Sequence, residues 1–266
     1  MLVKILLTPL LILLCLLAVR RWGSFVGGVI VGLPLISGPV SFFLTLEQGA
    51  AFSATASFNT LLGVLACTTA ALIYPWLAAW GMPWFVALPA ALCGFFVGGW
   101  AVLHLTISPL WAVALAMLCP VLVMACLPRV AAGKPANGRA LSARVRVPVQ
   151  MACGVVIVLA VTGAARWLGP GWSGVLMFFP VMICSIVPFA HAALGAAAVV
   201  NIFRGIMAGW FGCIAFAVVV MTGVEHLPLW LCYTLATVAA LLASAAVSLL
   251  ESWLQQKHAV GAEAES

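Results

Sequence analysis

The chain has 266 residues, a net charge of +6, 66% hydrophobic residues and only 6% charged residues. Soluble globular domains have roughly a quarter of their residues charged, so this composition excludes a soluble protein and predicts an integral membrane protein. A spanning helix needs about 20 mostly apolar residues, and apolar windows of that length cover nearly the whole chain. The cations flank these windows or gather in one loop, which is typical of topology determinants and not of a nucleic-acid-binding surface.

Nine spanning helices are predicted, giving an all-α polytopic bundle. Their approximate ranges are 3–19, 24–46, 52–77, 83–103, 109–127, 148–165, 171–190, 197–221 and 227–250. Pro34 and Pro39 interrupt the second helix, and Pro180 and Pro188 interrupt the seventh. In hydrocarbon, a helix broken by proline and glycine persists only where protein or a water-filled cavity receives the freed backbone groups. The second and seventh helices are therefore the predicted centre of the protein.

The first half of the chain recurs in the second half at a fixed offset of 146 residues. In this register Arg20, Gly23, Gly28, Pro34, Gly49, Gly63 and Cys67 match Arg166, Gly169, Gly174, Pro180, Gly195, Gly209 and Cys213. We interpret the matches as a duplication. The predicted organisation is a four-helix repeat (1–107), a linker helix (108–127), a basic loop (128–147), a second four-helix repeat (148–250) and a polar tail (251–266). Because one odd helix separates the two repeats, the second is inverted relative to the first.

The charge distribution predicts an orientation. With nine helices, the first loop, the basic loop and the C-terminus share one side, and this side carries most of the cations outside the helices. The positive-inside rule makes it the cytoplasmic side. The N-terminus is then outside and the C-terminus cytoplasmic.

Inverted repeats with broken helices are a common architecture of secondary transporters, whose substrate site lies near the bilayer midplane. The predicted substrate-binding residues come from both broken helices and from the eighth helix: Pro34, Ser37, Gly38, Pro39, Ser41, Pro180, Ser185, Asn201 and Arg204. Two alternatives stay open. In the first, the breaks are ordinary kinks that help the helices pack. In the second, which concerns Arg204 alone, its side chain extends to the membrane interface and does not face a cavity.

Five titratable residues near helix ends form a predicted gate or pH-sensing group: Glu47, His104, His191, Glu225 and His226. The alternative is that they are ordinary solvated helix ends. Glu47 is the first carboxylate of the chain, which contains no Asp. This scarcity argues against a cation carrier coupled to protons or sodium, because such carriers need an acid inside the membrane.

Other motifs add packing features and no chemistry. The nine cysteines lie in apolar segments without a CxxC pair, so we expect neither a metal site nor a cofactor. The catalytic motifs of hydrolases, metalloproteases and nucleotide-binding enzymes are absent from the sequence, and no enzyme activity is expected. The patterns Gly28-x-x-x-Gly32 and Gly205-x-x-x-Gly209 favour close helix packing, within one chain or in a homo-oligomer.

The motif Gly32-Leu-Pro-Leu with Pro39 and Glu47-x-Gly49, and its counterpart Phe179-Pro180 with His191 and Gly195, are similar to the pattern of the GlpM-like family of small bacterial inner-membrane proteins. The first half has Thr45 where the second has His191. The resemblance implies four-helix units and an inner-membrane location, and it implies no substrate.

The sequence thus predicts a small secondary permease or exporter of an organic metabolite, anionic or neutral, with a cavity between the second and seventh helices. Its partners would be the lipid bilayer and one small molecule, and not nucleic acid. The alternative is a non-transporting membrane partner, such as an assembly factor for envelope lipid or polysaccharide machinery.

Overall fold

The computed structural model describes residues 2–35, 37–130, 143–167, 172, 175, 176 and 178–264. The described residues form α1 (Leu2–Gly32), α2 (Ser37–Gln48), α3 (Ala50–Ala79), α4 (Trp84–His104), α5 (Pro109–Cys126), α6 (Ala143–Trp167), α8 (Val181–Gly223) and α9 (Leu229–Ala264). These residues contain no strand, so the predicted all-α class is confirmed. Five helices, α3, α4, α5, α8 and α9, contain stretches long and apolar enough to cross a membrane, and the chain is membrane-embedded.

The predicted count of nine helices is not confirmed, because the described residues form eight. Two glycines that were expected to separate helices instead bend continuous ones. Gly23 bends α1 with φ 89°, and Gly195 bends α8 with φ 80°. Conversely, the proline break at Pro34 divides the predicted second helix between the end of α1 and α2.

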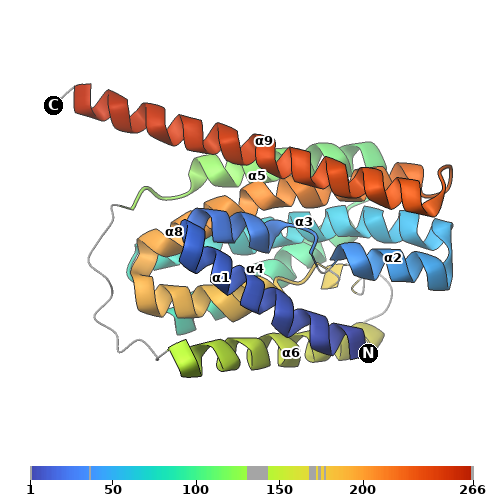
Figure 1. Cartoon of the computed structure of the whole chain (residues 1–266), viewed down its shortest axis with the longest axis horizontal. Coiled ribbons are helices and arrows are strands. Elements are labelled where there is room, and N and C mark those ends of the chain that lie inside the picture. Colours follow the sequence, from blue (N-terminus) through green and yellow to red (C-terminus); the bar gives the residue numbers. More distant parts are fainter. Residues whose placement is uncertain are drawn as a thin grey trace.

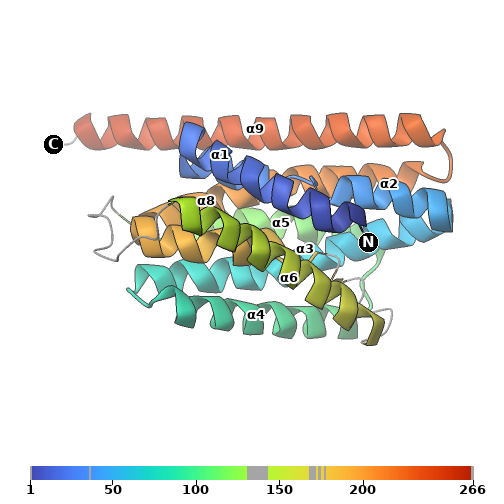
Figure 2. The same cartoon turned by 60° about the horizontal axis from the view of Figure 1, so that its bottom comes forward.

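The helices α3 and α8 form the centre of the bundle. Their most apolar stretches are 72% buried, against 28% for α4 and 22% for both α5 and α9. Phe203, Ile206 and Met207 of α8 and Leu61 and Tyr74 of α3 are fully buried in the main core. Figures 1 and 2 show the other helices arranged around these two.

The junction of α2 and α3 and the bend of α8 at Gly195 lie at opposite ends of the molecule. The junction of α2 and α3 is at the right of Figure 1, whereas α8 reverses direction at the left. α2 and the first half of α8 therefore point in opposite directions along the bundle axis. The C-terminal end of α9 lies at the same end as the bend of α8 (Figure 1).

Both segments expected to be polar connections are partly helical. α6 begins at Ala143, inside the predicted basic loop, and residues 131–142 of that loop lie outside the described residues. α9 continues to Ala264, through most of the predicted tail. No proline interrupts residues 229–264, and an ion pair of Glu251 attaches this end of α9 to α8.

Candidate functional site

The proline breaks before α2 and α8 have the same hydrogen bonds, residue for residue, at the 146-residue offset. The Leu35 amide donates to the Leu33 carbonyl at 2.8 Å, and the Val181 amide donates to the Phe179 carbonyl at 2.7 Å. The carbonyl of each proline accepts the first backbone hydrogen bond of the helical segment that follows. These bonds are Gly38 N–H to Pro34 at 2.8 Å and Cys184 N–H to Pro180 at 3.0 Å. We call these two segments, α2 and the part of α8 before Gly195, the half-helices.

A single proline produces each break. Pro180 has φ −77° and ψ 58°, which with the bond between its two neighbours is an inverse γ-turn. The proline ring fixes φ near this value, so the turn is locally encoded. Pro39 and Pro188 lie inside α2 and α8, and Pro39 is tolerated in the first turn because that turn leaves its amide positions unpaired. Only the first proline of each predicted pair therefore interrupts its helix.

A cysteine thiol satisfies the carbonyl two residues before each proline. Cys213 Sγ donates to the Gly32 carbonyl at 3.1 Å, and Cys67 Sγ donates to the Phe178 carbonyl at 3.2 Å. The cysteines are equivalent at the same offset, and so are the two acceptors. Each donor belongs to the opposite half of the sequence from its acceptor. The two halves are thus joined by reciprocal contacts at the level of the breaks.

The glycine pairs meet within one chain, which confirms the predicted close helix packing. A Cβ at Gly205 would overlap the carbonyl oxygen of Phe25, and a Cβ at Gly32 would lie 2.9 Å from the Cα of Gly209. α1 and α8 therefore cross with their backbones in contact, as small residues permit in membranes. At Gly63, the counterpart of Gly209, an added Cβ would overlap the side chain of Phe178 and not a backbone.

Gly49 and Gly195 have nearly the same backbone conformation. Gly49 has φ 89° and ψ 171°, and Gly195 has φ 80° and ψ −174°. This region is essentially restricted to glycine. No atom lies within 4 Å of a Cβ built on either residue, so conformation and not crowding requires glycine there. Each half-helix ends at one of these bends.

A cluster of hydroxyl groups lies at the end of α2, just before Gly49. The Tyr233 hydroxyl of α9 is 2.8 Å from Ser41 Oγ and 2.6 Å from Thr45 Oγ1. Thr45 Oγ1 also contacts Ser53 Oγ of α3. Thr45 and Ser53 are buried, so the cluster joins α2, α3 and α9 through satisfied polar groups.

His191 occupies the position equivalent to Thr45 in the other half, and it is also buried. Its Nδ1 lies 3.4 Å from the Tyr74 hydroxyl of α3, and the two rings are 5.8 Å apart. Tyr74 and Tyr233 are the two tyrosines of the chain. Each half-helix thus ends with a buried polar side chain that contacts a tyrosine.

Of the predicted substrate-binding residues, none lines the pocket described below. Pro180 and Ser185 are buried, and Ser185 Oγ donates to the Val181 carbonyl at 2.8 Å. Gly38 faces the Phe216 ring, 3.7 Å from a Cβ built on the glycine. Asn201 is exposed. The side chain of Ser37 lies outside the described part of the structure.

Arg204 has a carboxylate partner that the sequence did not indicate. Its Nη1 lies 3.2 Å from Glu251 Oε1 of α9, and both side chains are mostly buried. The charge of Arg204 is therefore compensated within the protein. This pairing weakens the expectation that Arg204 balances a substrate anion.

The predicted gate residues occupy both ends of the bundle. Glu47, Glu225 and His226 are exposed, and the C-terminal end of α2 and the α8–α9 connection both lie at the right of Figure 1. His104 stacks on Trp100 with ring centres 4.4 Å apart. No ion pair joins these four residues within the described ranges. His191 is the buried member of the group and lies beside the bend of α8.

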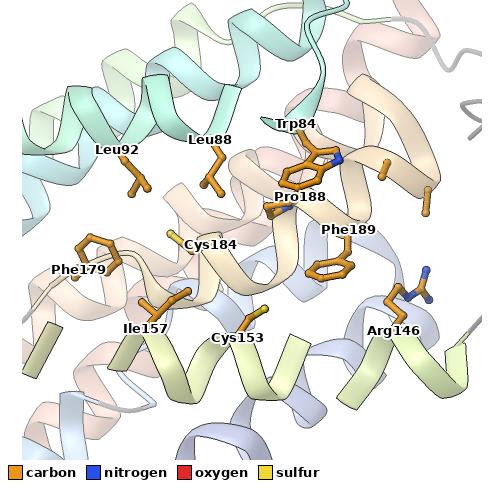
Figure 3. A pocket seen from close by; sticks show the side chains of 12 residues that line it. Trp84, Leu88, Leu92, Arg146, Cys153, Ile157, Phe179, Cys184, Pro188 and Phe189 are labelled. Atoms are coloured by element: carbon orange, nitrogen blue, oxygen red, sulfur yellow. The ribbon is translucent and has the colours of Figure 1, made fainter. Parts of the chain in front are cut away.

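An apolar pocket of about 480 Å³ lies between α4, α6 and the first half of α8. It reaches Phe179, Cys184 and Pro188 of the second broken segment, but no residue of the first. The predicted cavity between the second and seventh helices is therefore not the described pocket. Figure 3 shows the Arg146 guanidinium at one end of the pocket and Phe179 and Ile157 towards the other.

Sequence reasoning missed Tyr74, Tyr233, Arg146 and Gln150. The tyrosines carried a signal, because they are the only two in the chain and both lie in apolar segments. Arg146 and Gln150 were assigned to the basic loop and to the start of the sixth helix, with no indication that α6 places them beside α8.

These features define a polytopic, all-helical membrane protein with two equivalent proline breaks. No known protein family, curated protein or solved structure gives a match to the chain. Among the described residues, no group of three or more His, Cys, Asp or Glu side chains is placed to hold a metal ion.

Proposed function

We propose that this protein is a small secondary permease or exporter of an organic metabolite, anionic or neutral, built from two inverted repeats. The observation that carries the proposal is the pair of proline breaks with equivalent backbone and thiol hydrogen bonds. Transporters with inverted repeats place such discontinuous helices at the repeat interface and alternate access around them. The N-terminal dipole of each half-helix favours an anionic or strongly dipolar group.

The proposed topology has nine membrane crossings. The two halves of α1 on either side of Gly23, and the two halves of α8 on either side of Gly195, each belong to different crossings. The segment from Ser24 through the Pro34 break to the end of α2 makes one crossing. We place the N-terminus outside and the C-terminus in the cytoplasm of a bacterial inner membrane. The opposite ends reached by the α2–α3 junction and the bend of α8 support this inversion (Figure 1).

A non-transporting membrane partner is the second candidate. The tight packing around the breaks favours it, because Gly28 and Gly32 contact α8 directly and Phe216 covers Gly38. In the permease, this packing would correspond to a closed state.

Flux measurements in liposomes test the proposal. The full chain, reconstituted and supplied with a panel of small carboxylates and their neutral amides, should give saturable uptake of at least one compound. Pro180→Ala should abolish this uptake, because it removes the constraint that fixes the break. Pro89→Ala, at an exposed proline inside α4, is the matched control and should retain it. Absence of saturable flux from a folded protein that co-purifies with another membrane protein would favour the second candidate.

A further inference from the structure

The pocket beside α8 has a composition and a shape that the permease proposal does not use. Its walls come from three helices, with Trp84 and Leu88 on α4, Cys153 and Ile157 on α6, and Pro188 on α8. The lining is apolar apart from Arg146. A site for a water-soluble metabolite needs several convergent polar groups, so this lining fits an apolar chain better.

We call this pocket between α4, α6 and the first half of α8 the groove. Arg146 forms its cationic end. It is half-buried, and within the described residues it makes no hydrogen bond or ion pair. No carboxylate lines the pocket. A guanidinium without a protein partner favours a phosphate, which it binds through two parallel hydrogen bonds.

A second unsatisfied group lies one helical turn from Arg146. Gln150 is 1% exposed, and its Oε1 has no hydrogen-bond partner. At 100° per residue, Arg146, Gln150, Cys153 and Ile157 fall within an arc of about 60° on α6. Arg146, Cys153 and Ile157 of this face line the pocket, whereas Gln150 is buried behind it and is not part of the lining.

The groove has the depth of one membrane leaflet. Ile157 follows Arg146 by eleven residues, which corresponds to about 16 Å along the axis of α6. Half of a hydrocarbon core of about 30 Å is nearly the same length. Figure 3 shows the cation at one end of the groove and Phe179, next to the proline break, at the other. A lipid with its headgroup at Arg146 would extend its chain towards the centre of the bilayer.

The groove opens where lipid is available. Exposed apolar side chains flank it on both outer helices, with Phe85 and Val97 on α4 and Val149 and Val156 on α6. Its charged end adjoins the basic loop, on the proposed cytoplasmic side. Basic pockets between spanning helices on that side bind the headgroups of anionic lipids.

We propose that the groove between α4, α6 and the first half of α8 binds one acyl chain of an anionic phospholipid, whose phosphate contacts Arg146. This site is independent of any transport activity.

Photo-crosslinking tests the proposal with the full chain in phosphatidylcholine nanodiscs. The probe is phosphatidylglycerol with a diazirine in its acyl chain, and peptide mass spectrometry locates the crosslinks. We expect them on α4, α6 and α8 at the groove. Arg146→Gln should weaken the labelling about tenfold, because it removes a charge-assisted hydrogen bond to the phosphate. Arg146→Lys should retain part of it.

Three controls make the result decisive. Arg129→Gln changes an exposed cation outside the groove and should leave the labelling unchanged. Leu88→Trp fills the groove without changing charge and should reduce it. A phosphatidylcholine probe should label the groove weakly. The proposal would be overturned by equal labelling with both lipids, or by equal labelling of Arg146→Gln and Arg129→Gln. Crosslinks outside the groove, or displacement of the probe by a water-soluble carboxylate, would also overturn it. Unchanged melting temperatures would show that the variants are folded.

Discussion

At the scale of single residues, glycine positions divide into two kinds with different physical requirements. At Gly28, Gly205 and Gly209 the backbone of another helix occupies the space that a Cβ would need. At Gly49 and Gly195 the space is open, and the positive φ imposes the requirement. The two kinds predict different responses to substitution.

Gly205→Val should strongly destabilise the protein, because the added carbons overlap the backbone of α1 and force α1 and α8 apart. Overpacking of this kind costs about 1–3 kcal/mol, or more where backbone must move. Gly163→Val, at a helical glycine with no atom near the added Cβ, is the matched control. Thermal unfolding in detergent should show a clear loss for the first variant and little change for the second.

Gly49→Ala and Gly195→Ala should destabilise the protein by similar amounts, about 1–3 kcal/mol each, because both would force alanine into the same disfavoured backbone region. The melting temperatures of the two variants provide the comparison. A neutral effect at one position and a large effect at the other would contradict their structural equivalence.

At the scale of helices, the ion pair between Arg204 and Glu251 connects α8 to the extended end of α9. This contact lies directly after the predicted end of the membrane span, within the helical extension of α9. It also gives Arg204 a structural role, in addition to the binding role that the sequence predicts.

Glu251→Gln should lower the melting temperature, because it leaves the mostly buried Arg204 without its anion. Adding Arg204→Gln should recover part of the loss. Glu225→Gln, at an exposed loop carboxylate, should have no effect. A double-mutant cycle with no coupling between residues 204 and 251 would show that the pair contributes nothing to stability.

The sequence predicted local features well and long-range partners poorly. Hydropathy identified a helical membrane protein, and Pro34 and Pro180 located the two breaks, because hydrophobic length and a fixed proline φ act locally. Gly23 was taken for part of a loop, since the adjacent arginines looked like a helix end. The contact of Thr45 with Tyr233 joins residues 188 positions apart, and no local pattern specifies such a pairing. Arg146 was likewise predicted as loop charge and not as part of a groove.

At the scale of the whole molecule, reciprocal contacts join the two halves of the chain. The thiols of Cys67 and Cys213 and the carbonyls they bind are equivalent at one offset. The halves therefore interlock at their breaks, and a change at one break should have a counterpart at the other.

Cys67→Ala and Cys213→Ala should lower the free energy of unfolding by similar amounts. Each should lose about 1 kcal/mol, the contribution of a hydrogen bond to a backbone carbonyl. Serine at either position keeps a donor and should cost less. Cys93→Ala, at an exposed cysteine of α4, is the control. Unequal losses, or alanine and serine variants of equal stability, would argue against the hydrogen-bonding role.

The most direct test of the central claim, inversion of the two repeats, is the sidedness of the two bends. In a variant without native cysteines that keeps its fold, Glu47→Cys lies beside the Gly49 bend and Leu194→Cys beside the Gly195 bend, and both positions are exposed. A membrane-impermeant maleimide added to intact spheroplasts should label position 47 directly and position 194 only after permeabilisation. Labelling of both positions from the same side would contradict the inverted arrangement.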